Sequence, residues 1–184
     1  MLGWFKRDVT VQLAPAPPEA SLDQNGRRIA PLFPGLITPE TATDDQKMSA
    51  LSWAKDWCRY SGAVTEGWRE YLNDALAGRR PKRPLAGDPE GDPLVVDIAV
   101  SALRQAAQRN RMVRTSRALP WAELRIGPVD PATEDCLCDV ARSIAGKLIA
   151  VQDFPVLPLP GCTAIKCYCW SRQMTEAEAR KRDI

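Results

Sequence analysis

The sequence predicts a mainly α-helical protein with a small α+β, cysteine-rich C-terminal part. Three observations predict this class. Apolar residues recur every three to four positions over much of residues 43–109, sixteen prolines divide the chain into short elements, and five of the six cysteines fall within residues 136–169. At 184 residues the chain is long enough for one ordinary domain with a buried core. We expect a helical hairpin and a third helix, followed by a fourth helix and a cysteine knuckle.

Four parts are expected along the chain. They are a Pro-rich extended arm (1–38), a helical part (39–117), a cysteine-rich part (118–170) and a tail helix (171–184). The arm has no sustained helical period, and its apolar residues near positions 29–37 favour packing against the body of the protein. Alternatively, the arm reaches a neighbouring subunit, which makes an oligomer possible.

Capping and stop signals set the expected elements. The first two helices run from Thr43 to about Tyr60 and from Thr65 to Gly78, and within the tail Thr175 caps the last helix. The other elements are a helix from Pro93 to about Arg109 with Asn110 as terminator, a strand over 119–126, a helix from Asp130 to Gly146 and a brief strand over 147–151.

Histidine is absent from the chain. Its absence removes the commonest general base, the Ser-His and Cys-His nucleophile pairs, and every mixed Cys/His zinc site. We therefore expect a non-enzymatic protein. The formal net charge of +2 is too small to define a class of partner.

The N-terminal residues and the hydropathy pattern bear on the compartment. No apolar run approaches the roughly 20 residues that a membrane-spanning helix needs, and residues 1–10 lack the apolar core of a signal peptide. We expect a cytoplasmic protein with reduced thiols, which favours metal binding over disulfides. Trp4 and Phe5 lie beside two cations, and an alternative role for these residues is contact with a membrane surface or with a partner.

The clustered cysteines predict a zinc site. Zinc accepts four thiolates in a tetrahedron, and a Cys-x4-Cys-x-Cys knuckle facing a helix supplies them without histidine. A proline-rich, stiff segment over 154–160 leads into the knuckle. The expected ligands are Cys138, Cys162, Cys167 and Cys169, with Cys136 as a substitute for Cys138. A reduced or disulfide-linked structural cluster and an iron–sulfur cluster are the alternatives.

A second candidate site is a group of arginines without any acidic residue between them. Such a group can bind phosphates or an acidic partner. Alternatively, the arginines lie in solvent at the C-terminal end of a helix, where positive charges interact favourably with the helix dipole. The members of the group are Arg104, Arg109, Arg111, Arg114 and Arg117.

The cysteine-rich part carries two resemblances. Cys138, Gly146-Lys147, the run 154–162 and Cys167-Tyr-Cys169 resemble the C-terminal pattern of a family of small bacterial proteins with a Pro-x-Leu-Pro-Leu-Pro-x-Cys run and a terminal Cys-x-Cys. The same order is similar to the C-terminal cysteine segment of phage Mu-type minor head proteins, which have Cys-x-x-Cys where this chain has Cys136-x-Cys138. The first resemblance implies a shared cysteine structure, and the second implies a virion or assembly component.

These observations predict a protein that acts by interaction or assembly, stabilised by a zinc-binding cysteine knuckle. A protein partner is expected. The alternatives are a phage-like virion component, a nucleic-acid-binding accessory protein that uses the arginines from 104 to 117, and a redox enzyme that uses Cys167 and Cys169.

Overall fold

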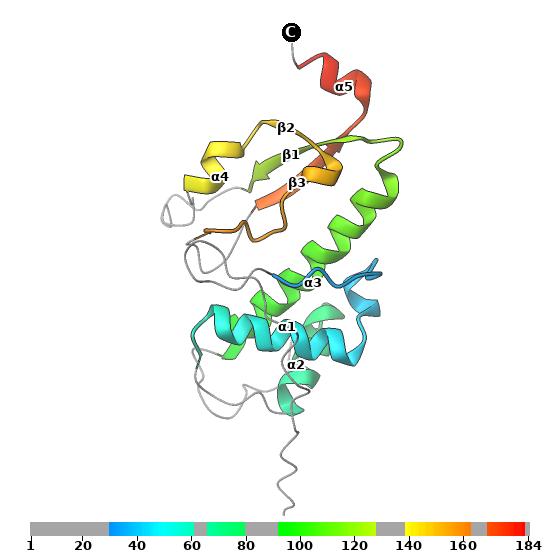
Figure 1. The fold of residues 1–184 in the computed structure, drawn as a ribbon. Coiled ribbons are helices and arrows are strands. Elements are labelled where there is room, and N and C mark those ends of the chain that lie inside the picture. Colours follow the sequence, from blue (N-terminus) through cyan, green and yellow to red (C-terminus); the bar gives the residue numbers. More distant parts are fainter. Residues whose placement is uncertain (1–29, 61–65, 80–91, 128–138, 163–168, 183–184) are drawn as a thin grey trace, which may run out of the picture.

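The computed structural model describes residues 30–60, 66–79, 92–127, 139–162 and 169–182 (Figure 1). These residues are mainly helical with a small β part, as the sequence predicts. The β part is a three-stranded antiparallel sheet. The elements are α1 (Asp44–Trp57), α2 (Glu66–Leu76), α3 (Asp92–Thr115), β1 (Trp121–Ile126), α4 (Asp139–Ile144), β2 (Leu148–Ala150), β3 (Cys169–Met174) and α5 (Glu176–Arg180). Short 3-10 helices occupy Pro39–Thr41 and Val151–Asp153.

The first core lies where α1 and α2 pack on α3, at one end of the molecule (Figure 1). Thr43 caps α1 as predicted, in a capping box in which the Gln46 backbone N–H donates to the Thr43 hydroxyl at 3.2 Å. The cap expected at Thr65 lies outside the described residues. Fully buried side chains of this core include Leu51, Leu72 and Leu103.

Helix α3 is longer than the sequence predicts, because it continues past Asn110 to Thr115. Asn110 does not end the helix, since its side-chain amide donates to the backbone carbonyls of Phe33 and Leu36. Two residues further on, Met112 is buried against the sheet, where its sulfur accepts a hydrogen bond from Ser171. Tertiary contacts therefore hold the last turns of α3 in the helix.

A second core surrounds the sheet and includes Met112, Leu124, Phe154 and Leu159 among its buried side chains. Helix α3 contributes to both cores, and Trp57 of α1 also packs against both. In Figure 1, α3 runs from the α1–α2 end to the end that contains the sheet, α4 and α5. The two cores are consequently joined by one continuous helix.

The sheet has the strand order β2-β1-β3, and both pairings are antiparallel. The strands predicted near 119–126 and 147–151 are present as β1 and β2. Strand β3 was not predicted, and it takes up the first residues of the expected tail part 171–184. The helix within that part begins at Glu176 as α5, after the Thr175 cap that the sequence predicts. Backbone pairing with β1 over the whole of Cys169–Met174 explains why this segment is a strand.

The two faces of the sheet differ. Residues that alternate along a strand lie on opposite faces, and residues opposite each other in register share a face. The inner face belongs to the second core and contains Ala122, Leu124, Ile126, Cys169, Ser171 and Gln173. The outer face contains Trp121, Glu123, Arg125, Trp170, Arg172 and Met174, with Leu148 of β2 opposite Glu123.

Glutamine side chains of α3 satisfy backbone carbonyls of β3, which is an edge strand. Gln105 Nε2 donates to the Cys169 carbonyl at 3.1 Å, and Gln108 Nε2 donates to the Ser171 carbonyl at 3.0 Å. An uncovered edge strand is a template for pairing with another chain. The helix therefore covers this edge and sets the position of Cys169.

We predict that the C-terminal capping box weakens in acid. The Thr175 backbone N–H donates to the Glu178 carboxylate at 2.9 Å, and the Thr175 hydroxyl donates to it at 3.0 Å. These two hydrogen bonds, the backbone one first, lower the pKa of Glu178 from its ordinary value of 4.5. A lowered pKa means that the carboxylate stabilises the folded cap above pH 4.5 and loses this effect as the pH falls through the lowered value. The Thr175 amide chemical shift, followed by NMR against pH, should titrate with a midpoint below 4.5.

Glu178→Gln is the matched control, because Gln46 fills the same position in the α1 capping box without titrating. In this variant the Thr175 amide shift should stay flat over the same pH range. A midpoint at or above the ordinary value in the unsubstituted protein contradicts the prediction.

Candidate metal centre and interaction surfaces

Two of the predicted zinc ligands, Cys162 and Cys169, are buried in the second core, with 1% and 6% of their surface exposed. Cys162 follows a turn in which Gly161 has a φ of +81° and the Cys162 N–H donates to the Leu159 carbonyl at 2.9 Å. Glycine suits this left-handed conformation. Cys169 is the first residue of β3 and lies opposite Ile126. Turn and strand thus place both thiols in one apolar cluster.

The other predicted ligands, Cys136, Cys138 and Cys167, lie outside the described residues. Within the described ranges, no group of three or more His, Cys, Asp or Glu side chains is arranged to hold a metal ion. The zinc site therefore stays a prediction. Cys58 follows α1 and packs against the first core, where burial raises the pKa of its thiol.

The proline-rich segment before Cys162 lies against both α3 and the second core. Phe154, Leu157 and Leu159 are buried. The Arg109 guanidinium donates to the Phe154 carbonyl. No helix or strand is assigned between Phe154 and Cys162, which agrees with the expectation of a non-helical segment leading into the knuckle.

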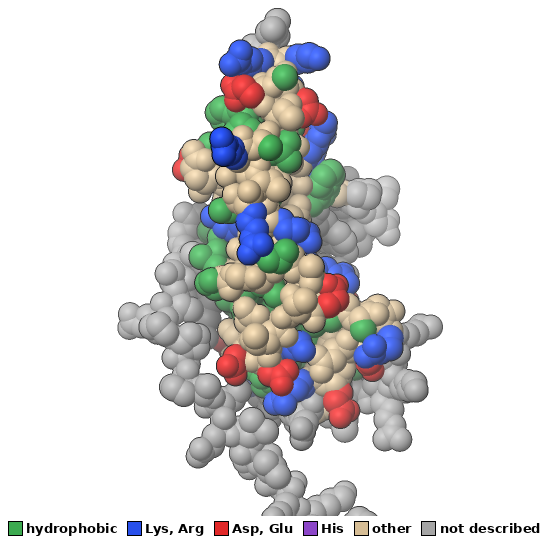
Figure 2. Space-filling view, turned by 90° about the vertical axis from the view of Figure 1, so that its right-hand side faces the viewer, with side chains coloured by type: hydrophobic (Ala, Val, Ile, Leu, Met, Phe, Trp, Pro, Cys, Tyr) green, Lys and Arg blue, Asp and Glu red, His purple; other side chains and the backbone are tan. Residues whose placement is uncertain are grey.

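The five arginines predicted to form an anion-binding group have different environments. Arg109 is partly buried, and its guanidinium holds the proline-rich segment through the Phe154 carbonyl. Arg111 is exposed, and its Nη1 atom donates to the Ile37 carbonyl at 3.3 Å. Arg104, Arg114 and Arg117 are exposed. Figure 2 shows Lys and Arg side chains spread from the upper to the lower end of one face of the molecule, with acidic side chains mainly near the two ends. Binding of anions or nucleic acid by this group stays a prediction.

The end of the arm crosses α3 near the middle of the molecule (Figure 1). Asn110 Nδ2 donates to the Phe33 carbonyl at 3.0 Å and to the Leu36 carbonyl at 2.8 Å, and both of these side chains are buried in the first core. Phe33 has a φ of +44°, which a bulky residue adopts only when its surroundings hold it. Helix α3 therefore holds the described end of the arm at this point.

We predict that Asn110→Ala loosens the arm. The substitution removes both donors and leaves two partly buried carbonyls without them, which should lower the free energy of unfolding by about 1–2 kcal/mol. Limited proteolysis should then cut near Phe33 and Leu36 faster than in the unsubstituted protein. Arg104→Ala, on the same helix at an exposed position, is the control and should change neither stability nor cleavage. Unchanged cleavage in Asn110→Ala contradicts the role of this contact.

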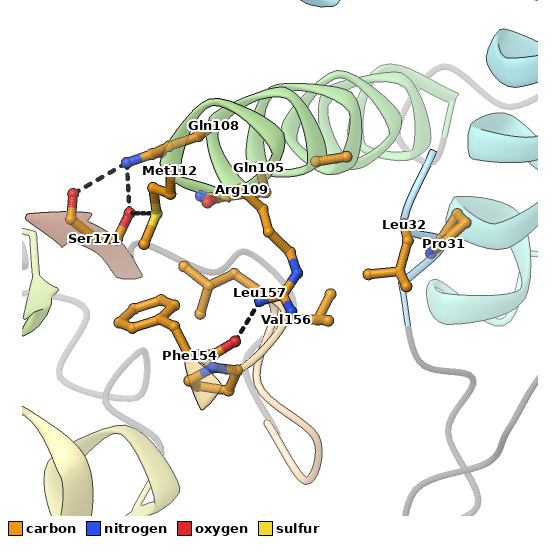
Figure 3. A pocket seen from close by; sticks show the side chains of 12 residues that line it. Pro31, Leu32, Gln105, Gln108, Arg109, Met112, Phe154, Val156, Leu157 and Ser171 are labelled. Atoms are coloured by element: carbon orange, nitrogen blue, oxygen red, sulfur yellow. Dashed lines mark hydrogen bonds between the residues drawn. The ribbon is translucent and has the colours of Figure 1, made fainter. Parts of the chain in front are cut away.

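A hollow lies between α3, the arm and the proline-rich segment (Figure 3). Its lining includes Leu32, Arg109, Met112, Val156 and Leu157. The cavity volume is about 10 Å³, which is near the minimum for one water molecule and far too small for an organic ligand. Leu32 at its rim is 49% exposed. This region is a surface with an exposed apolar side chain, and it is not a small-molecule pocket.

Sequence reasoning missed Glu123, a carboxylate that is 2% exposed on the outer face of the sheet. Its Oε2 atom lies 3.0 Å from Arg125 Nη2 and 2.6 Å from Arg182 Nη1. The alternation in 119–126 indicates correctly that Glu123 and Arg125 share a face, but it gives no sign that residues after α5 cover that face. The sequence signal that could have indicated this site is the pair Glu123 and Arg125, two residues apart on one face of a strand. A second cation, here Arg182, joins this pair.

Comparison with protein-family models, curated proteins and solved structures found no match to the chain. In the part of the chain that the structure describes, no helix combines the length and apolar character needed to cross a membrane.

Proposed function

We propose that the protein acts by binding a protein partner, without catalysis, through the described end of the arm around Leu32, which α3 anchors. The observation that carries this proposal is the anchoring of the arm by Asn110, which holds Phe33 and Leu36 at a fixed point on a packed helix. The exposed Leu32 beside this anchor supplies an apolar contact. Large exposed apolar side chains next to an ordered, non-helical segment suit the recognition of a protein surface.

Site-specific photo-crosslinking tests this function. A photo-reactive amino acid replaces Leu32 in one variant and Val113 in the other, because the two side chains have similar exposures of 49% and 51%. We expect a defined crosslinked partner, identified by mass spectrometry, from position 32 and none from position 113. Asn110→Ala should reduce the yield from position 32, since it releases the arm.

Equal crosslinking from both positions, or none from position 32, contradicts the proposal. If the crosslinked partner is a second copy of the chain, the arm is an oligomer contact. If the crosslinked partner is a capsid or portal protein, the chain belongs to a virion-type assembly.

The same proposal gives the cysteines a structural role, in which zinc bound by Cys162, Cys169 and the thiols at positions 138 and 167 holds the second core. Burial of Cys162 and Cys169 in one cluster supports it. A metal held by four thiolates adds binding free energy to the folded state, which suits a part of the chain with short elements. When bound, the ion supplies crosslinking and takes no part in a reaction.

Metal analysis of the purified protein tests this role. We expect one zinc per chain, lost in Cys162→Ser and Cys169→Ser and kept in Cys58→Ser, which alters a thiol outside the cluster. Chelation should lower the unfolding temperature of the unsubstituted protein, a result independent of whether the serine variants fold. Absence of stoichiometric zinc, together with free titration of Cys162, Cys167 and Cys169 by a thiol reagent, overturns the zinc site.

A further inference from the structure

The outer face of the sheet is only partly covered. Helix α5 lies over one end of it, where Trp121 Nε1 donates to Glu176 Oε2 at 2.6 Å and Met174 is 1% exposed. At the other end Trp170 is 44% exposed, one of the few large apolar side chains on the described surface. The burial of neighbouring residues on the inner face, Cys169 and Ser171, shows that β3 turns Trp170 outward.

Arginines flank Trp170 on this face. Arg125 lies directly opposite Trp170 in the β1–β3 register, and Arg172 is two residues further along β3. Their side chains are 37% and 47% exposed. Residues opposite each other, or two apart on one strand, have side chains within reach of a common ligand. Trp170 therefore faces solvent with two arginines as neighbours on the same face, of which Arg125 pairs with Glu123 and Arg172 with Glu178.

Positive charge is in excess over the outer face as a whole and over the α5 end beyond it. On the outer face, at Lys147 just before β2, and along the chain from α5 to Arg182, the described residues include six cations and three carboxylates. The cations are Arg125, Lys147, Arg172, Arg180, Lys181 and Arg182, and the carboxylates are Glu123, Glu176 and Glu178. Glu123 is buried beneath two of the arginines and pairs with both, so it holds them in place from below. Lys147 and Arg182 also line an open hollow beside β2.

We propose that this face binds single-stranded nucleic acid, with a base stacked on Trp170 and backbone phosphates on Arg125 and Arg172. Base stacking on an aromatic side chain together with basic groups that follow the phosphates is the usual basis of single-strand binding. A base pair within a duplex does not expose the face of its base, so single strands are bound in preference to duplexes.

The test is fluorescence anisotropy with labelled twelve-nucleotide oligothymidylate and oligouridylate at low salt, and with a duplex of the same length. Trp170→Ala should weaken single-strand binding about tenfold or more, and Trp170→Phe should retain most of it. Arg172→Gln should lower the slope of log affinity against log salt by about 0.7, the value for one phosphate contact of a single strand. Circular dichroism confirms that each variant is folded.

Val113→Ala is the matched control, because it changes an equally exposed apolar side chain, and it should leave binding unchanged. The pair Arg104→Gln and Arg114→Gln tests the arginine group of α3 as the competing site, and it should weaken binding less than Arg172→Gln does. Four results overturn the proposal: no binding at low salt, equal affinity for the duplex, no effect of Trp170→Ala, or a loss in the α3 arginine variants equal to that in Arg172→Gln. Heparin binding that competes fully and is independent of Trp170 also overturns it, since it indicates a charge effect alone.

Discussion

Replacing both Arg125 and Arg182 with methionine should lower the free energy of unfolding at neutral pH by about 3 kcal/mol, the lower end of the range for removing the partner of a buried charge. Glu123 is 2% exposed, and these two guanidiniums lie 3.0 and 2.6 Å from its Oε2 atom. Without them the carboxylate stays buried and uncompensated. Urea unfolding followed by circular dichroism measures the change.

Adding Glu123→Gln to the double variant separates this cause from lost packing. The amide has nearly the same shape and no charge, so it should restore much of the lost stability. Arg142→Met is the control for an exposed pair, because Arg142 lies 3.7 Å from an Asp139 side chain that is 98% exposed, and it should change stability by less than about 1 kcal/mol. A double variant that Glu123→Gln does not rescue contradicts the role given to Glu123.

Leu103→Ala and Leu124→Ala should each lower the free energy of unfolding by about 2–5 kcal/mol, the usual effect of a cavity in a packed core. Leu103 is fully buried in the first core and Leu124 is fully buried in the second. Because α3 contributes to both cores, both substitutions should shift a single unfolding transition. Tryptophan fluorescence and far-ultraviolet circular dichroism, recorded on the same samples against urea, should give coincident curves.

Leu32→Ala is the control, since this side chain is 49% exposed and its loss should change stability by less than about 0.5 kcal/mol. Two separated transitions, of which Leu103→Ala shifts only the first, would instead mean that the helical and sheet-containing parts unfold independently. The continuous α3 and the contacts of Trp57 with both cores argue for one transition.

Local chemistry accounts for the features that could be predicted. The Thr43 and Thr175 caps form within four residues, so their hydrogen bonds depend on nearby sequence alone. The same holds for the alternation that predicts β1. Helix α3 was predicted too short because Asn110 is a poor helix former, and only the carbonyls of the arm, more than seventy residues earlier, explain its place inside the helix.

Among the candidate site residues, the sequence indicated cysteines and arginines by type and spacing, but it did not distinguish their environments. Arg109 and Arg104 look equivalent in the chain, yet Arg109 binds the Phe154 carbonyl while Arg104 is exposed. The difference depends on where the proline-rich segment lies. Spacing assigned Cys162 and Cys169 to one site, but it did not predict that both would be buried among the apolar side chains of the second core.

The sequence by itself determined the helical class, the caps, the places of β1 and β2, and which side chains alternate together along a strand. Only the tertiary structure decided that Met112 would join the sheet to α3, that Cys169–Met174 would become a strand, and that Glu123 would be buried while Trp170 remained exposed. The physical reason is range. Caps and periodicity arise from interactions within a few residues, whereas burial of a given face depends on which distant segment covers it.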